Sequence, residues 1–189
     1  MGDQPTKGEQ PDEKDRYPWY AVVEGNTIPL QGDFINKCPI VVPVVAEQIK
    51  EDQRRLQADI KLINVVVLSQ SCDLEQKKIS LVLVCPVVLF SKFEEEQEFF
   101  RGSKGKKALK EGYAPGYHLM NKCDEEGFER GLVVADFRNV YGVPLDYLLG
   151  FCKESGRRLR LLPPYREHLS QAFARYFMRV GLPVGVDLN

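Results

Sequence analysis

Two apolar runs near the middle of the chain constrain its fold more than any other feature. The first begins at Ile63 and leads into a polar stretch that ends at Leu74, and the second is Leu81–Val88. Each run is too short for a buried helix and rich in β-branched residues, so each predicts a buried strand. The polar residues between them, 73–78, predict a solvated turn. The sequence therefore predicts a β-hairpin over residues 63–88.

Composition favours a single globular domain. The 189 residues are 43% hydrophobic and 28% charged, with a formal net charge of −1, which points to neither a nucleic-acid nor a membrane partner. No run approaches the roughly 20 apolar residues that a membrane span needs. Residues 1–16 are polar and acidic, which predicts a disordered tail rather than a signal peptide. We expect a cytoplasmic protein with one domain at 17–183 and a tail at 184–189.

The cysteines argue against both a disulfide framework and a structural metal site. Their number is odd, and no two of them are spaced as Cys-x-x-Cys. Three lie in apolar runs, where a thiol is usually a small core residue. The pattern predicts no metal and no cofactor. The five are Cys38, Cys72, Cys85, Cys123 and Cys152.

Further short apolar stretches predict strands on both sides of the hairpin, at 21–23, 40–45, 117–120, 131–137 and 140–145. Prolines 39 and 43 would place the strand at 40–45 at an edge or kink it. Residues 46–60 carry apolar side chains among many charges and predict a short surface helix. Residues 93–116 are charged and irregular and predict a long insertion, partly helical.

A helix near the C-terminus is the clearest helical pattern in the chain. Pro163 and Pro164 suit its first turn, Leu169, Phe173, Phe177 and Val180 fall on one face, and Gly181 suits its end. The predicted class is mainly β (β+α), with five to seven short strands and this one well-defined helix. A small curled β-barrel with a C-terminal α-helix and a charged insertion fits this order best.

Four short motifs, in order, resemble those of the PemK/MazF family, the toxins of bacterial toxin–antitoxin pairs. Gly32–Ile35 resembles the family's opening strand, and Val65–Ser69 resembles its second strand. Val84–Pro86, followed by Ser91 and Lys92, resembles the third strand and the loop after it. Gly131–Asp136 resembles a later strand, and a C-terminal helix closes both. The resemblance spans roughly residues 32–180, with the 93–116 insertion outside it.

The resemblance implies an SH3-like barrel that dimerises, cleaves single-stranded RNA and is silenced by an antitoxin peptide. Cleavage of this kind needs a base for the ribose 2′-hydroxyl and a group that stabilises charge on the phosphate. In the family an arginine at the start of the second strand and a threonine after the third fill these roles. Here those positions hold Ile63, followed by Asn64 where proline is usual, and Val88. Neither aliphatic side chain can move a proton or hold an oxyanion.

Two other sets of residues are candidates for catalysis. Lys61, Arg54 or Arg55 could replace the missing arginine in space, acting with Ser69 or Ser71. Alternatively, Cys72 could be a nucleophile at a strand end, with His118 or His168 as its base. The competing interpretation of residues 69–74 is a turn, because serine and aspartate side chains bond to their own backbone and begin hairpins.

A basic C-terminal region is the candidate partner-binding surface, together with Asp136 and Arg138 at the end of a predicted strand. Arginine clusters bind phosphates and acidic partner segments alike, although a solvated helix face and a strand-end turn explain the same residues. The charged loop at 94–112 is either a partner-binding or protease-sensitive segment or a tolerated insertion. The arginines are Arg157, Arg158, Arg160, Arg166, Arg175 and Arg179.

The sequence therefore favours a PemK/MazF-like barrel that has lost the family's catalytic pair and acts mainly by binding a regulatory protein. The expected partner is an antitoxin or a sigma-factor-like protein, in a toxin–antitoxin or anti-phage system. The first alternative is an endoribonuclease with relocated catalytic residues, for which single-stranded RNA is the partner. The second is a cysteine-dependent enzyme at Cys72. A homodimer is compatible with each, and no membrane partner is expected.

Overall fold

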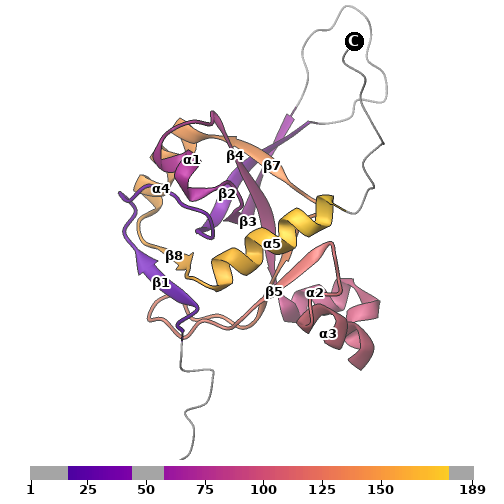
Figure 1. The fold of residues 1–189 in the computed structure, drawn as a ribbon. Coiled ribbons are helices and arrows are strands. Elements are labelled where there is room, and N and C mark those ends of the chain that lie inside the picture. The colour runs from indigo at the N-terminus through magenta and orange to yellow at the C-terminus, as the bar shows by residue number, and fades with distance from the viewer. Residues whose placement is uncertain (1–16, 44–57, 179–189) are drawn as a thin grey trace, which may run out of the picture.

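The computed structural model describes residues 17–43 and 58–178. In it the chain folds into two antiparallel sheets with helices packed around them (Figure 1). The β+α class expected from the sequence is confirmed. The strands are β1 (Tyr20–Val23), β2 (Phe34–Pro43), β3 (Ala58–Val67), β4 (Leu81–Leu89), β5 (Tyr117–Met120), β6 (Val133–Asp136), β7 (Tyr141–Pro144) and β8 (Arg158–Leu161). The helices are α1 (Ser71–Glu75), α2 (Phe90–Glu96), the 3-10 helix η2 (Glu98–Arg101), α3 (Ser103–Lys110), α4 (Leu145–Ser155) and α5 (Tyr165–Phe177).

The central hairpin is present, but its connection is not a simple turn. β3 and β4 pair antiparallel, with Val66 opposite Cys85. Between them the chain forms helix α1, in which the backbone N–H of Leu74 donates to the carbonyl of Gln70. The Leu74 side chain is fully buried and anchors this helix to the core. The expected solvated turn is therefore corrected to a short helix held by one apolar residue.

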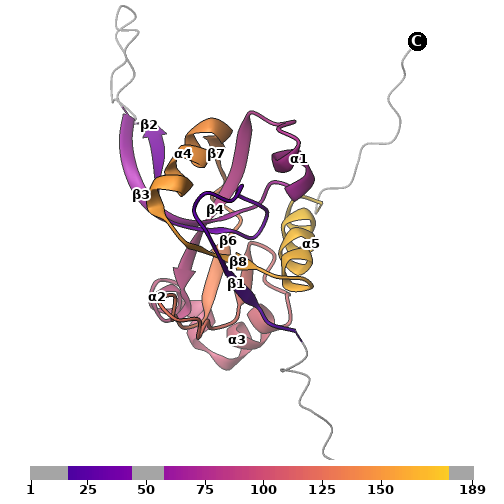
Figure 2. The ribbon, with the colours of Figure 1, turned by 90° about the vertical axis from the view of Figure 1, so that its left-hand side faces the viewer.

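The larger sheet does not close into a barrel within the described ranges. Its strand order is β2-β3-β4-β6-β5, with β7 paired to one end of β4, so β2 and β5 lie at opposite ends. β1 and β8 form a separate two-stranded sheet. In Figure 2, β2 and β3 project together beyond the rest of the sheet.

The middle of the sheet is buried on both faces, which explains why the central strands contain continuous apolar runs rather than alternating ones. Val66 and Leu68 pack on the α5 side, in a cluster with Phe34, Phe137 and Leu169. Val65 and Val67 pack on the opposite side, in a cluster that includes Leu74, Leu145 and Leu148. Side chains alternate along a strand, so successive valines serve different cores.

The charged insertion is an ordered subdomain rather than an irregular loop. Residues 90–110 form α2, η2 and α3, which lie together beneath β5 in Figure 1. They have their own core of Phe93, Phe100 and Leu109, which packs against Val134 of β6. The charges lie on the outside, where Lys106 Nζ is 2.7 Å from Glu94 Oε2. The apolar residues are spaced too irregularly for a periodicity argument to find them.

Other expectations are also corrected. Residues 58–60, assigned to a surface helix, belong to strand β3, and the rest of that predicted helix, 46–57, lies outside the described residues. Helix α4 and strand β8 were not expected, whereas α5 begins just after Pro163-Pro164 as predicted. Cys38, Cys85 and Cys152 are buried, as expected, and all five cysteines are free. No helix within 17–43 or 58–178 is long and apolar enough to cross a membrane.

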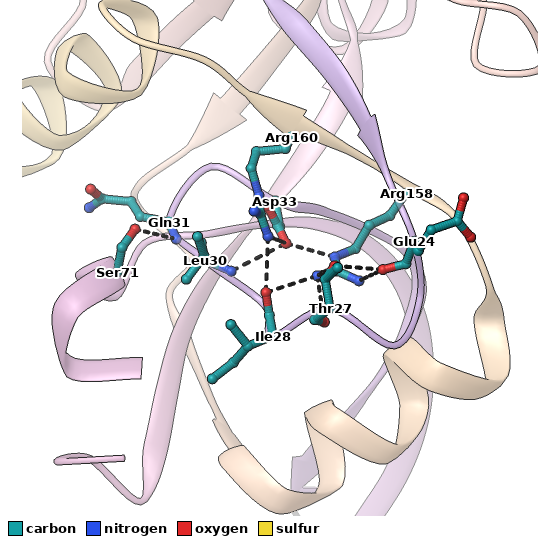
Figure 3. Close-up of polar contacts among 9 residues, drawn as sticks. All are labelled: Glu24, Thr27, Ile28, Leu30, Gln31, Asp33, Ser71, Arg158 and Arg160. Carbon is teal, nitrogen blue, oxygen red and sulfur yellow. Dashed lines mark hydrogen bonds and ion pairs between the residues drawn. The ribbon is translucent and has the colours of Figure 1, made fainter. Parts of the chain in front are cut away.

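A buried ionic network joins the loop before β2 to strand β8 (Figure 3). Asp33 is fully buried and accepts hydrogen bonds from Arg158 Nε at 2.6 Å and Arg160 Nε at 2.5 Å. Arg158 is itself buried, and its remaining nitrogens donate to the backbone carbonyls of Glu24, Thr27 and Ile28. Every charge here has a partner, so the network fixes the 24–33 loop without an unpaired ion.

Candidate functional site

The short strands β5 and β6 place functional side chains on two opposite surfaces. Tyr117 faces the α2–α3 subdomain, and Met120 packs in the cluster beneath α5. Alternation along β5 therefore turns His118 to the α5 side, where its ring lies parallel to that of Phe137. Helix α5 crosses this face of the sheet in Figure 1 and brings in the second histidine, His168.

Both histidines of the chain line one cavity of about 550 Å³ between the α3–β5 loop and helix α5. We call this cavity the histidine groove. A second cavity of about 350 Å³ adjoins it and shares Tyr113, Pro115 and Tyr117 with it. The side chains of the groove that carry charge, proton-transfer capacity or an aromatic ring are Lys110, Glu111, Tyr113, Tyr117, His118, His168 and Arg175.

His118 is held neutral in this groove. Its Nε2 atom is enclosed and has no hydrogen-bond partner within the described part of the chain. Burial, reinforced by the nearby His168, lowers the pKa of His118 from 6.5 to about 4. A neutral imidazole can accept a proton at pH 7. His168 is exposed on α5, so the two imidazoles of the groove have different environments.

The groove also contains cations that no carboxylate neutralises among the described residues. Within the same residues, Arg175 bonds only to a neutral amide, with Nη2 3.4 Å from Gln171 Oε1. Lys110 makes no ion pair among the residues that the structure describes, and the nearby Glu111 lies 3.9 Å from Lys107 instead. Tyr113 is 76% exposed beside them. Unpaired cations next to accessible aromatic rings are the features by which proteins bind single-stranded nucleic acid.

In the adjoining cavity, Asp136 and Arg138, predicted as partner-binding residues, pair with each other. Arg138 Nε and Nη2 donate to the two carboxylate oxygens at 2.9 and 3.0 Å, and Asn139 adds a third bond. Burial acts to raise the pKa of Asp136, but these hydrogen bonds outweigh it and the pKa is lowered. Arg138 also lies over the Tyr117 ring, 4.5 Å from its centroid. Its charge is already neutralised, unlike that of Arg175.

The predicted catalytic residues do not converge. Ser69 Oγ accepts from the backbone N–H of Leu83 at 2.8 Å, and Ser71 Oγ accepts from that of Gln31, so both serines have structural roles. Lys61 is exposed on the projecting part of β3, some six residues before its end, or roughly 20 Å along the strand. Arg54 and Arg55 lie outside the described residues.

The alternative site at Cys72 gains no support from its contacts. Cys72 is exposed on α1, and its Sγ lies 3.8 Å from Asp73 Oδ1. Within the described ranges it bonds to neither histidine. The two positions at which the family resemblance places catalysis also diverge, since Ile63 packs in the cluster beside α4 and Val88 in the cluster of the α2–α3 subdomain.

The predicted arginine surface is divided among several environments. Arg158 and Arg160 belong to the buried network with Asp33, so the expectation that they form a partner-binding face is corrected. Arg166 pairs with its neighbour Glu167 at 2.8 Å. Arg157 is exposed and Arg175 lies in the histidine groove, whereas Arg179 lies outside the described residues.

Sequence reasoning considered the histidines only as partners of Cys72, and it missed Lys110 and Tyr113 as site residues. Nothing in the spacing of positions 118 and 168 shows that they meet. Among the described residues, no group of three or more His, Cys, Asp or Glu side chains is arranged to hold a metal ion. In comparisons with known proteins, no family model, no curated protein and no solved structure matches the chain.

Proposed function

We propose that the chain binds single-stranded RNA in the histidine groove and cleaves it with His118 and His168. The observation that carries the proposal is the meeting of the chain's only two histidines, from β5 and α5, in one groove with cations that have no carboxylate partner within residues 17–43 and 58–178. The expectation of an RNA substrate, drawn from the PemK/MazF resemblance, points to the same chemistry at other residues. Under this proposal the six-stranded sheet corresponds to an opened SH3-like barrel, and the protein acts in the cytoplasm.

The chemistry follows from the environments of the two imidazoles. Neutral His118 takes the proton from a ribose 2′-hydroxyl, whose oxygen then bonds to the adjacent phosphorus. The bond from phosphorus to the 5′-oxygen breaks, and that oxygen receives a proton from His168. Arg175 and Lys110 balance the charge that develops on the phosphate oxygens. The products are a 2′,3′-cyclic phosphate and a 5′-hydroxyl.

The test is incubation of the purified protein with a long unstructured RNA, with analysis of the product ends. Cleavage that leaves cyclic phosphates is expected, and His168→Gln should reduce its rate by about 100-fold or more, in line with loss of one acid–base group. His168 is exposed, so this variant should fold normally. Intact RNA with the wild-type protein, or unchanged cleavage by His168→Gln, would overturn the catalytic role.

Binding is tested separately from cleavage. Arg175→Gln should weaken binding of RNA and reduce its dependence on salt, because it removes one phosphate contact. The matched control is Arg157→Gln, which removes an exposed arginine outside the groove and should leave binding unchanged. Equal losses in both variants would indicate attraction by net charge rather than binding in the groove.

An exposed apolar cavity favours a second candidate function, binding of a regulatory protein such as an antitoxin or a sigma-factor-like partner. The cavity has a volume of about 640 Å³ and lies between the projecting β2–β3 strands and β7. Val41, Ile60 and Leu81 line it and are 54–68% exposed. Exposed apolar patches of this kind mark interaction sites. Coexpression with the product of the adjacent gene should give a complex that Ile60→Ser weakens; no complex would remove this candidate.

A further inference from the structure

Arg130 is a half-buried cation in the segment between β5 and β6, outside the histidine groove. Its backbone is fixed by an isolated bridge to Cys123, with both N–H···O distances 2.9 Å. Its guanidinium carbon lies 3.9 Å from the centroid of the Phe34 ring and 5.5 Å from that of Tyr20. The guanidinium group therefore packs against the aromatic part of the core, although the side chain as a whole is half-buried.

No anion neutralises this cation within residues 17–43 and 58–178. Nε and Nη2 of Arg130 are enclosed and have no hydrogen-bond partner. Burial lowers the pKa of Arg130, as expected of a cation removed from water. Contact with two aromatic rings stabilises a desolvated cation by less than its desolvation destabilises it. The rings alone do not compensate for the burial.

A cavity of about 330 Å³ lies beside this arginine and is rich in hydrogen-bond donors. Arg130, Asn36 and Asn64 line it. Asn64 Oδ1 accepts the backbone N–H of Lys37 at 2.8 Å, which leaves the amide nitrogen of Asn64 free to donate. Lys37 has a φ of 50°, at an irregularity in the β2–β3 pairing. This irregularity holds Asn36 and Asn64 at the edge of the cavity.

We propose that this cavity binds the phosphate group of a small ligand, with Arg130, Asn36 and Asn64 as donors. Guanidinium and amide N–H groups match the geometry of phosphate oxygens. The cavity is several times larger than a phosphate ion, and the half-buried Phe128 lines the remaining space. A phosphate monoester with an aromatic group, such as a nucleoside monophosphate, fits this lining. Glu129 also lines the cavity, is exposed and disfavours ligands with further negative charge.

The test is thermal unfolding of the full chain at constant ionic strength. A ligand that binds only the folded state raises the midpoint temperature with its concentration. Inorganic phosphate and adenosine monophosphate should both raise it, with the nucleotide effective at lower concentration, whereas adenosine and acetate should not. If only inorganic phosphate acts, the site takes phosphate but not the proposed monoester. If neither phosphate compound acts, or acetate acts equally, the proposal is wrong.

Variants of residues that line the cavity show whether the phosphate-dependent shift in midpoint temperature comes from binding there. Arg130→Met fits the same aromatic surroundings without charge and should lose the phosphate-dependent shift. Asn64→Asp keeps the oxygen that accepts from Lys37 but adds an anion, so it should weaken binding at least about tenfold. This variant decides the question if Arg130→Met does not fold. Glu129→Gln should strengthen binding, and its control Glu125→Gln, in the same segment, should not.

The two sites are separable. His168→Gln and Arg175→Gln alter the histidine groove, which shares no residue with the Arg130 cavity, so both variants should retain the full phosphate-dependent shift. Loss of the shift in these variants, with retention in Arg130→Met, would place phosphate in the groove and overturn the proposal for Arg130.

Discussion

Two arginines, the buried Arg158 and the half-buried Arg130, differ in a way that separates structure from function. Arg158 uses its donors on the carboxylate of Asp33 and on three backbone carbonyls. Arg130 has two enclosed nitrogens without a partner in the described part of the chain, and two aromatic rings in place of a carboxylate. A buried cation whose hydrogen bonds are all satisfied stabilises the fold, whereas a cation without a neutralising anion is available to bind a ligand.

The largest expected effect comes from breaking the satisfied network. Arg158→Met leaves the carbonyls of Glu24, Thr27 and Ile28 without these donors and halves the charge that faces Asp33. Loss of one partner from a buried ion pair costs about 3–5 kcal/mol of the free energy of unfolding. Urea denaturation measures this cost. Arg157→Met, at the exposed neighbouring position, should stay within about 0.5 kcal/mol of wild type, and equal costs at both positions would contradict the structural role of Arg158.

The second prediction concerns His118, whose enclosed Nε2 atom has no hydrogen-bond partner among the described residues and whose ring is neutral. Its pKa is about 4 in the folded chain and near 6.5 when unfolded, so below pH 6.5 the unfolded chain binds a proton that the folded chain does not. Stability should therefore fall as the pH decreases from about 6.5 to about 4, by at most about 3.5 kcal/mol at about 1.4 kcal/mol per pH unit.

Urea denaturation across this pH range should show the loss in wild type and not in His118→Gln. Asp136 and Glu167 also have lowered pKa values and lose stability in acid, but they do so in both proteins, so the difference between the proteins isolates His118. Parallel curves for the two proteins would mean that His118 is solvated in the folded state.

A helix or strand can be predicted from the sequence when its own residues carry a recognisable hydrophobic pattern. The runs at 63–68 and 81–88 identify β3 and β4 because β-branched residues are concentrated there, and apolar spacing identifies α5. Leu145, Leu148 and Cys152 of α4 also show helical spacing, so that helix was detectable even though it was missed. In contrast, the core of the α2–α3 subdomain is irregularly spaced, and no local pattern reveals it.

The candidate site was harder to predict from the sequence because it depends on which helices and strands contact one another. Arg157, Arg158 and Arg160 look alike in the sequence, but the alternation of β8 places Arg158 and Arg160 on Asp33 and leaves Arg157 exposed. His118 and His168 are 50 positions apart and meet only because α5 packs across β5. Tertiary packing, rather than residue type, decides the role of each of these side chains.

A third arginine, Arg138, extends the comparison to an ion pair at the protein surface. Arg138 pairs with Asp136, but its side chain is 44% exposed, so water screens the pair. Asp136→Asn keeps one oxygen for the backbone N–H and Nε of Arg138, but it loses the charge and the second oxygen, which accepts from Arg138 Nη2 and Asn139 Nδ2. The expected cost in free energy of unfolding is therefore about 1 kcal/mol or less. A loss of stability near that of Arg158→Met would show that water has less access to the Asp136–Arg138 pair in solution than the exposure of Arg138 implies.

The smallest expected effect on stability belongs to Arg130, and it is the most direct test of the comparison. In phosphate-free buffer, Arg130→Met replaces an unneutralised cation with an apolar chain of similar length against Phe34 and Tyr20. Replacing a buried charge in this way is often neutral or stabilising, so the free energy of unfolding should lie within about 1 kcal/mol of wild type or above it. The same substitution at Arg158 is the matched control, since the two variants differ only in whether partners are left behind. A loss of about 3 kcal/mol at Arg130 would mean that this arginine has a structural partner in solution, and the distinction between the two arginines would then fail.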